Sequence, residues 1–181
     1  MKTPWLELRR GSTGRQRLGE PMIFFGVGEA TFAISASAVE EIRGADGLRP
    51  LVQGEVAKVR HLLERAGKTY YVVDAGCHFR MLPIPGNRVL VLRRGKAALL
   101  VQRIDLMREV SSIYALPSAF RGEERQWYRG LAAIPGAAGA PALGQAGEEF
   151  QVVPVLNPDA LLTTGEADSL GMMLRLKGAH A

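Results

Sequence analysis

From Met22 onward the chain consists of short apolar runs rich in β-branched and aromatic residues, separated at close intervals by turns that contain glycine. This pattern is typical of small antiparallel barrels and sandwiches. Glycine tolerates the positive φ angles that tight reversals between right-twisted strands require, so three of these turns predict β-hairpins. The predicted hairpins turn at Gly28-Glu29, at Ala66-Gly67-Lys68 and at Gly95-Lys96.

The strands that flank these turns are predicted at residues 22–27 with 31–35, 59–65 with 69–74, and 88–93 with 97–104. In the second pair, Tyr70, Val72 and Asp74 alternate with Tyr71 and Val73, which predicts a half-buried strand. The apolar residues between 56 and 63 also fit a helical spacing, so periodicity alone leaves that segment undecided. We interpret it as a strand.

Beyond Ile104 the sequence predicts a short irregular piece, followed by strands at 128–134 and 150–156. Residues 135–147 between these strands consist only of Pro, Gly, Ala, Leu and Gln, so we expect a long, exposed and mobile loop. The total of about nine or ten short strands exceeds one five-stranded barrel and suits two barrels packed together.

Two helical segments are predicted near the C-terminus. Asn157 is a suitable N-cap and Pro158 a suitable first residue for a short helix at 159–162. A second helix at 166–176 places apolar side chains on one face, ending in a lysine, at the spacing of Leu170, Met173, Leu174 and Lys177. We expect this face to be covered by the barrels or by a partner.

The chain has 181 residues, 47% of them hydrophobic, which is enough to bury a core without disulfide or metal support. Its single cysteine, Cys77, cannot form an internal disulfide, and the N-terminus lacks the pattern of a secretory signal peptide. We therefore expect a cytoplasmic location. The apolar runs are far shorter than the about 20 residues that span a bilayer, so no membrane insertion is expected.

The isoelectric point of about 9.7 suggests nucleic-acid binding, but the basic residues are unevenly distributed. Residues 1–20 have a net charge of +3, which leaves +2 for the rest of the chain. A body so close to neutral lacks the electrostatic footprint that binding to a phosphate backbone requires. We interpret residues 1–20 as a basic mobile arm, and keep a basic small-barrel nucleic-acid-binding protein as an alternative function.

No motif for a nucleotide or a metal emerges from the sequence. Gly26-Val27-Gly28 lies in a predicted hairpin, lacks the third glycine of a dinucleotide-binding loop and does not open a helix. One cysteine and three histidines do not form a zinc-binding pattern. We interpret Cys77 as a small buried hydrophobic residue, with a catalytic thiol as a remote alternative.

The acidic pairs of the sequence also fail as catalytic groups. Adjacent residues such as Glu40 and Glu41 are expected to face opposite sides of a strand, and pairs in loops are expected to be solvated. The sequence therefore predicts no catalytic residue, no cofactor and no metal site.

Charged and aromatic residues gather near the ends of the predicted strands. Tryptophan, tyrosine and arginine dominate binding hot spots because each combines a large contact area with a polar group. Taken singly, each aromatic residue here is equally well explained by packing. The residues in question are Arg65, Arg103, Arg108, Trp127, Tyr128 and Arg129.

Several short motifs follow one another in a fixed order along the chain. They are Phe32-Ala33-Ile34, Val39-Glu40-Glu41-Ile42-Arg43-Gly44, Val72-Val73-Asp74, residues 104–110, Arg129-Gly130-Leu131-Ala132 and residues 153–157. In this order and at approximately this spacing, residues 21–163 resemble the CheW-like domain of bacterial chemosensory adaptors. Each motif alone is weak, but the ordered series is fairly specific.

The resemblance implies a mainly β fold of two five-stranded antiparallel barrels packed side by side, with residues 164–181 as a C-terminal helical extension. It also implies a non-enzymatic adaptor that bridges the cytoplasmic tip of methyl-accepting chemoreceptors to the regulatory domain of a CheA-type histidine kinase. Neither nucleic acid nor direct membrane insertion is then expected. The partner-binding residues that the resemblance implies are Val39, Glu41, Ile42, Arg65, Gly67 and Asp74.

The chain departs from the family pattern at the second hairpin. The Asn-Leu-Arg-Gly turn of the family corresponds here to Glu64-Arg65-Ala66-Gly67, in which one additional residue separates the arginine from the glycine. The arginine of that turn is important for partner binding in the family. Arg65 takes its place if the hairpin accommodates the extra residue, and Ala66 takes its place if not. These departures leave a divergent CheW-like scaffold in a non-motility pathway as a further alternative.

Overall fold

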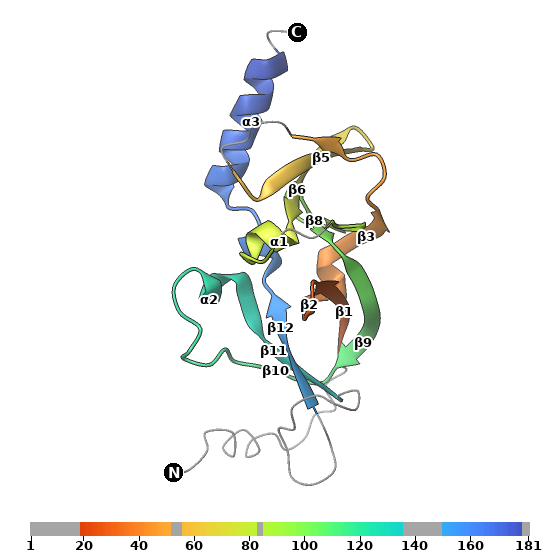
Figure 1. Cartoon of the computed structure of the whole chain (residues 1–181), viewed down its shortest axis with the longest axis vertical. Helices are drawn as coiled ribbons and strands as arrows, with labels where there is room; N and C mark the ends of the chain where they lie inside the picture. Colours follow the sequence, from red (N-terminus) through yellow and green to blue (C-terminus); the bar gives the residue numbers. More distant parts are fainter. Residues whose placement is uncertain (1–18, 52–55, 83–84, 136–149, 179–181) are drawn as a thin grey trace.

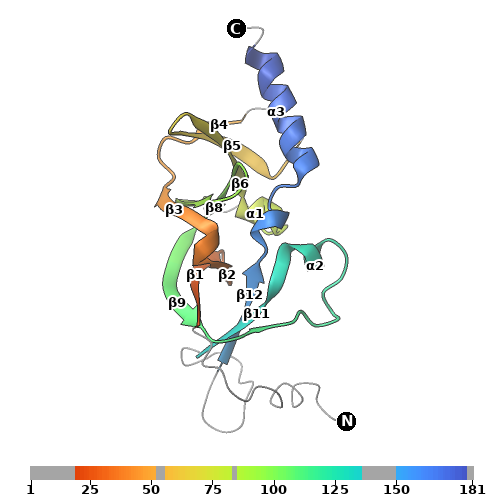
Figure 2. The ribbon, with the colours of Figure 1, turned by 180° about the vertical axis from the view of Figure 1, so that it is seen from behind.

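The structure, a computed structural model, describes residues 19–51, 56–82, 85–135 and 150–178 of the chain. The predicted arm and the predicted loop at 135–147 lie almost entirely outside the described residues. Within them, twelve strands form two six-stranded sheets, one below the other, with a long helix beside the upper sheet (Figures 1 and 2). No described helix is long and apolar enough to cross a membrane.

The first sheet has the strand order β10-β11-β12-β2-β1-β9. Neighbouring strands are antiparallel, except that β12 and β2 run parallel. The strands are β1 (Glu20–Val27), β2 (Ala30–Ser35), β9 (Arg103–Val110), β10 (Ile113–Tyr114), β11 (Tyr128–Pro135) and β12 (Phe150–Leu156).

The second sheet has the strand order β3-β7-β8-β6-β5-β4, again with one parallel pair, β6 and β8. Because β4 and β10 have only two residues each, either sheet contains five longer strands, as predicted. The strands of the second sheet are β3 (Val39–Gly44), β4 (Arg49–Pro50), β5 (Val59–Arg65), β6 (Lys68–Asp74), β7 (Arg88–Leu92) and β8 (Ala97–Val101).

Each sheet curls around an apolar core of its own. In the first sheet, Val110 of β9 and Ile134 of β11 share one buried cluster although their strands are far apart in the sheet order. In the second, Leu63 of β5 and Val89 of β7 meet in the same way. The predicted architecture of two small barrels is confirmed.

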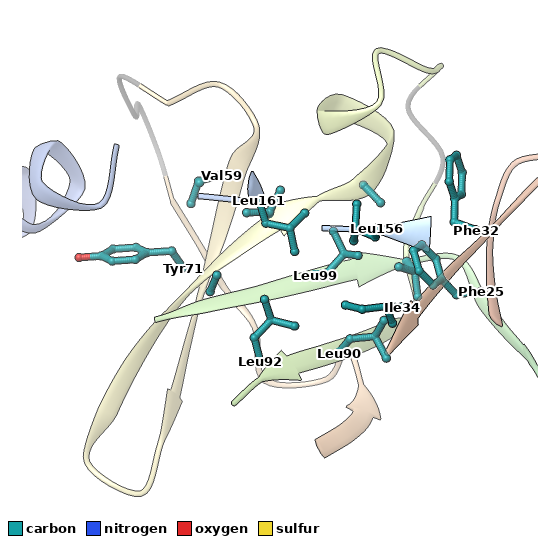
Figure 3. Close-up of a cluster of buried hydrophobic side chains, with 14 of the residues drawn as sticks. Phe25, Phe32, Ile34, Val59, Tyr71, Leu90, Leu92, Leu99, Leu156 and Leu161 are labelled. Carbon is teal, nitrogen blue, oxygen red and sulfur yellow. The ribbon is translucent and has the colours of Figure 1, made fainter. Parts of the chain in front are cut away.

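A third and larger cluster lies between the two sheets and draws side chains from both (Figure 3). Successive residues of a strand point to opposite faces, so Phe24 fills the first barrel while Phe25 faces the second. The prediction that residues 69–74 form a half-buried strand is wrong for the same reason. Tyr70 faces the interior of its barrel and Tyr71 faces the shared cluster, so both faces of β6 are covered.

The three predicted hairpins are confirmed, because β1 and β2, β5 and β6, and β7 and β8 are joined at the expected turns. The prediction beyond them was wrong in one place. The strand expected at 97–104 ends at Val101, and β9 begins at Arg103 and continues to Val110, through residues expected to be irregular. Since β9 pairs with β1 on one side and is largely exposed, its sequence lacks the apolar pattern of a buried strand.

The described helices are short, apart from the last one. They are η2 (Ala36–Ala38), α1 (Ala75–His78), α2 (Glu124–Trp127), η3 (Pro158–Ala160) and α3 (Thr164–Gly178). The short helix predicted at 159–162 is the 3₁₀ turn η3, and the Asn157 side chain accepts a hydrogen bond from the backbone N–H of Asp159.

Helix α3 packs against the second barrel, so the same chain covers the apolar face that the sequence predicts. Leu170 is only 1% exposed, and Met173 and Leu174 pack against the shared cluster. The side chain of Lys177, predicted on this face, lies outside the described side chains. A reciprocal pair of hydrogen bonds between Thr163 and Glu166 caps the helix at its N-terminus.

A candidate protein-binding surface

The β5–β6 hairpin presents Arg65 at the rim of the second barrel. Arg65 is the last residue of β5 and pairs with Lys68 across a two-residue turn. The turn residues Ala66 and Gly67 have φ angles of +47° and +72°. Positive φ at both central residues is the geometry that matches the twist of the flanking strands, so the turn directs the end of β5 tightly into β6.

Two carboxylates of β3 hold the Arg65 side chain. Its Nη1 donates a hydrogen bond of 2.9 Å to Oε1 of Glu40, and its Nε lies 2.5 Å from Oε2 of Glu41. The hydrogen bond to Glu40, and next the charge of Glu41, raise the pKa of the Arg65 guanidinium. About one-third of the Arg65 side chain remains exposed, so the ion pairs leave it accessible at the surface.

These ion pairs join strands that are not neighbours. In the sheet order, β7, β8 and β6 separate β3 from β5. The contact between Arg65 and Glu40 therefore spans the opening of the curled sheet. The expectation that Glu40 and Glu41 face opposite ways is wrong, because the pairing of β3 with β7 contains a bulge. Val39 pairs with Leu92 and Glu41 with Val91, which leaves Glu40 without a register partner.

The remaining predicted residues of β3 differ in accessibility. Val39 is 6% exposed and belongs to the shared apolar cluster, so its side chain supports the start of the strand from inside. Ile42 is 37% exposed and follows Glu41 directly. Arg93 fastens this strand, because its guanidinium donates hydrogen bonds of 3.1 Å each to the carbonyl oxygens of Ser37 and Val39.

Asp74 lies away from this group. It ends β6 at the opposite end from the hairpin, and a strand of this length separates the two ends by roughly 20 Å. Its carboxylate accepts a hydrogen bond of 3.0 Å from the backbone N–H of Cys77, so Asp74 caps helix α1. The structure thus brings Arg65, Glu41 and the Gly67 turn to one rim. Ile42 is exposed on the same strand as Glu41, and Asp74 lies elsewhere.

Sequence analysis missed Glu40 and Arg93 as residues of this surface. In the sequence, Glu40 belongs to an acidic pair and to the motif at 39–44, and its partner is 25 positions away in the chain. No local pattern reports such a contact. The one signal in the sequence is Arg65 itself, because an arginine at the end of a hairpin strand is a candidate for an ion pair at the opening of the barrel. It does not indicate which carboxylate is the partner.

The aromatic residues predicted near strand ends contribute to packing. Tyr128 stacks on Phe79 with ring centroids 6.0 Å apart, and burial raises its pKa to about 12. Trp127 packs against the shared cluster and against His78, with ring centroids 5.0 Å apart. These rings fasten α2 of the first barrel to α1 of the second.

The potential metal ligands of the described residues do not cluster. No group of three or more His, Cys, Asp or Glu side chains there is placed to hold a metal ion. Cys77 is half-buried, and its Sγ accepts a hydrogen bond of 3.7 Å from Nη1 of Arg60.

Comparison with known proteins identifies the fold. A family model described as the CheW-like domain matches residues 21–166. The structure is similar to that of the scaffolding protein TtCheW from Thermoanaerobacter tengcongensis, with a TM-score of 0.63 and 11% sequence identity over 86% of this chain and 96% of that one. At this identity the structural likeness shows the fold alone. No curated protein matches the chain by sequence.

Proposed function

Because the chain belongs to the CheW-like domain family, we propose that it is a non-enzymatic adaptor that couples chemoreceptors to a CheA-type histidine kinase. The resemblance noted in the sequence is thus confirmed at the level of the family. The proposal adds the partners: the regulatory domain of the kinase and the cytoplasmic tip of a methyl-accepting chemoreceptor. Such a protein works in the cytoplasm and reaches the membrane through protein contacts.

The observation that most supports an adaptor is the Arg65 surface. Its guanidinium is fixed by Glu40 and Glu41 and stays partly exposed. Arginine is one of the residue types that dominate binding hot spots, and here its side chain is already held in one place. Because the strands that present it have buried faces, the surface is preorganised and binding loses little conformational entropy.

We assign separate roles to the partner-binding residues of the proposal. Arg65, Glu41 and Ile42 contact the kinase domain directly. Val39 and Gly67 do not contact the partner but position the residues that do. Val39 fixes the start of β3, and Gly67 forms the turn of the hairpin. Asp74 acts at a distance through the N-terminus of α1, which it caps. In the same proposal residues 21–163 form the adaptor unit, residues 1–20 an arm and residues 164–181 an extension.

The decisive experiment is a calorimetric titration of the full chain with the regulatory domain of the CheA-type kinase from the same organism. We expect one-to-one binding at micromolar affinity or tighter. The Arg65→Glu variant should lose at least tenfold in affinity. Arg129→Glu is the matched control, because Arg129 is an arginine of comparable exposure, paired with Glu20, on the first barrel.

Three outcomes are informative. Loss of binding in Arg65→Glu but not in Arg129→Glu supports the proposed surface. If Arg65→Glu and Arg129→Glu both bind the kinase domain as tightly as the wild type does, Arg65 is not part of the interface. If the folded wild-type chain binds neither the kinase domain nor a soluble receptor fragment, the adaptor proposal fails and binding to nucleic acid becomes the next candidate.

A further inference from the structure

A groove separates helix α3 from the second barrel on one side of the helix. It has a volume of about 670 Å³ and is lined by α3, by η3 and by the turn between β7 and β8. The apolar residues that line the groove include Ala97, Leu162, Ala167 and Met172. Met172 is 66% exposed, although it lies on the helix that covers the shared core.

A glycine makes the helix wall of this groove thin. Gly171 has no side chain, and a Cβ built there would meet only the Tyr71 hydroxyl oxygen, at 3.6 Å. Figure 3 shows the Tyr71 ring pointing from β6 towards α3. Tyr71 is 5% exposed, and burial raises its pKa, which keeps the phenol neutral. The groove therefore offers a neutral hydroxyl group at its base, beside an apolar wall.

Charge is distributed unevenly around the groove. Arg94 and Lys96 lie on the turn between β7 and β8, and Arg175 lies on the C-terminal half of α3. None of these three exposed cations forms an ion pair with another described residue. The acidic residues of the lining, Asp159 and Asp168, belong to η3 and to the N-terminal half of α3. The groove lining thus contains three cations without an ion pair among the described residues, and two acidic residues.

We propose that this groove is a second binding surface, which takes a chemoreceptor segment presenting an apolar side chain flanked by carboxylates. The apolar side chain would contact Met172 and Ala97, and the carboxylates would meet Arg94, Lys96 and Arg175. This inference rests on the proposed adaptor function. An adaptor that joins two partners needs two surfaces on one rigid body, and Arg65 supplies only one of them.

The structure permits a variant that fills the groove while preserving the fold. Gly171→Leu extends a larger side chain from the helix wall of the groove, and Gly171→Ala is a smaller change whose Cβ meets the Tyr71 hydroxyl at ordinary contact distance. Both substitutions favour the helix, since glycine is a poor helix former. Gly165→Leu is the matched control, because Gly165 is also in α3, has nothing within 4 Å of its Cβ position and does not line the groove.

A second pair of variants tests the charges. Arg94→Glu combined with Lys96→Glu reverses the two positive charges that the turn between β7 and β8 contributes to the groove. Arg121→Glu combined with Arg125→Glu makes the same change in net charge at exposed positions before β11 of the first barrel. Any effect common to both pairs reports long-range electrostatics, which salt screens, whereas a specific contact affects the first pair only.

The experiment measures the affinity of each full-length variant for a soluble cytoplasmic fragment of a chemoreceptor from the same organism, and for the kinase regulatory domain. We expect Gly171→Leu and the Arg94–Lys96 pair to weaken receptor binding at least tenfold and to leave kinase binding within twofold. Gly165→Leu and the Arg121–Arg125 pair should retain both affinities.

The groove inference is overturned if a folded Gly171→Leu variant, or Gly171→Ala where leucine prevents folding, together with the Arg94–Lys96 pair, binds the receptor fragment as the wild type does. In that case wild-type binding to both partners still supports the adaptor proposal. If the wild type binds neither partner, the proposed function fails and the groove inference fails with it. This outcome is seen with the unmodified chain, before any variant is measured.

Discussion

The rings of His78 and Trp127 lie 5.0 Å apart, which places an ionisable side chain where α1 of the second barrel meets α2 of the first. His78 is 4% exposed, and its Nε2 atom has no hydrogen-bond partner among the described residues. Arg80 covers the other ring, with its guanidinium 5.6 Å from the centroid of Trp127. The imidazole of His78 is therefore enclosed at the contact between the two barrels, where burial makes it difficult to protonate.

This geometry predicts acid sensitivity. Burial, and next the charge of Lys58, lower the pKa of His78 from 6.5 to about 4, against an opposing effect of Glu166. The unfolded chain then binds the proton more tightly than the folded chain. Stability should be complete above pH 6.5 and should decline by up to about 3 kcal/mol as the pH falls towards 4. Urea denaturation at a series of pH values measures this decline, and both His78→Asn and His78→Phe should flatten it.

The ion pairs of Arg65 predict that recognition and folding can be separated. Exchanging the charges, with Arg65→Glu and Glu40→Arg in one chain, rebuilds the pair in the reverse sense beside the unchanged Glu41. Because exposed ion pairs contribute little to stability, the melting temperature should stay within about 3 °C of the wild type. Affinity for the kinase domain should nevertheless remain at least tenfold lower. Recovery of full affinity would show that the pair only supports the fold.

Local patterns in the sequence were sufficient for the hairpins. The turns at Gly28, Gly67 and Gly95 have positive φ angles, and each is fixed by residues within a few positions of it. The cap that Asn157 makes on η3 is equally local. Such features could be predicted because the physical cause and its structural consequence lie in the same short segment.

Contacts between distant segments could not be predicted in this way. Strand β9 owes its existence to pairing with β1, whose residues lie 77 to 90 positions earlier than their partners, so its own exposed sequence looked irregular. The bulge that turns Glu40 and Glu41 towards Arg65 depends on the register between β3 and β7. Both faces of β6 are buried because a second barrel packs against the first, which no single strand reveals.

The hairpin turn makes a prediction about backbone strain. Ala66 has a φ of +47°, a conformation that costs an L-residue roughly 1–2 kcal/mol and costs glycine little. Ala66→Gly relieves this strain, but part of the gain in stability is offset because glycine has more conformational freedom in the unfolded chain. The net effect should be a stabilisation of about 0.5 kcal/mol. Gly67→Ala should have the opposite effect, about 1 kcal/mol of destabilisation, since its φ is +72° and nothing crowds its Cβ position. Equilibrium denaturation of both variants tests the signs, and a destabilising Ala66→Gly contradicts the argument.

The last prediction concerns the packing of α3. Leu170 reaches the shared cluster together with Leu161 and is almost completely buried, although α3 extends beyond the matched family region. Truncation leaves a cavity that a barrel wall cannot close, so Leu170→Ala should reduce the free energy of unfolding by about 2–5 kcal/mol. Met172→Ala, two positions away on the exposed side, should change it by less than about 0.5 kcal/mol. Because the two residues share a helix, equal effects in guanidinium denaturation would mean that helix propensity, rather than packing on the barrel, holds α3 in place. Unequal effects would establish the helix as part of the folded core, and hence as a rigid wall for the groove beside it.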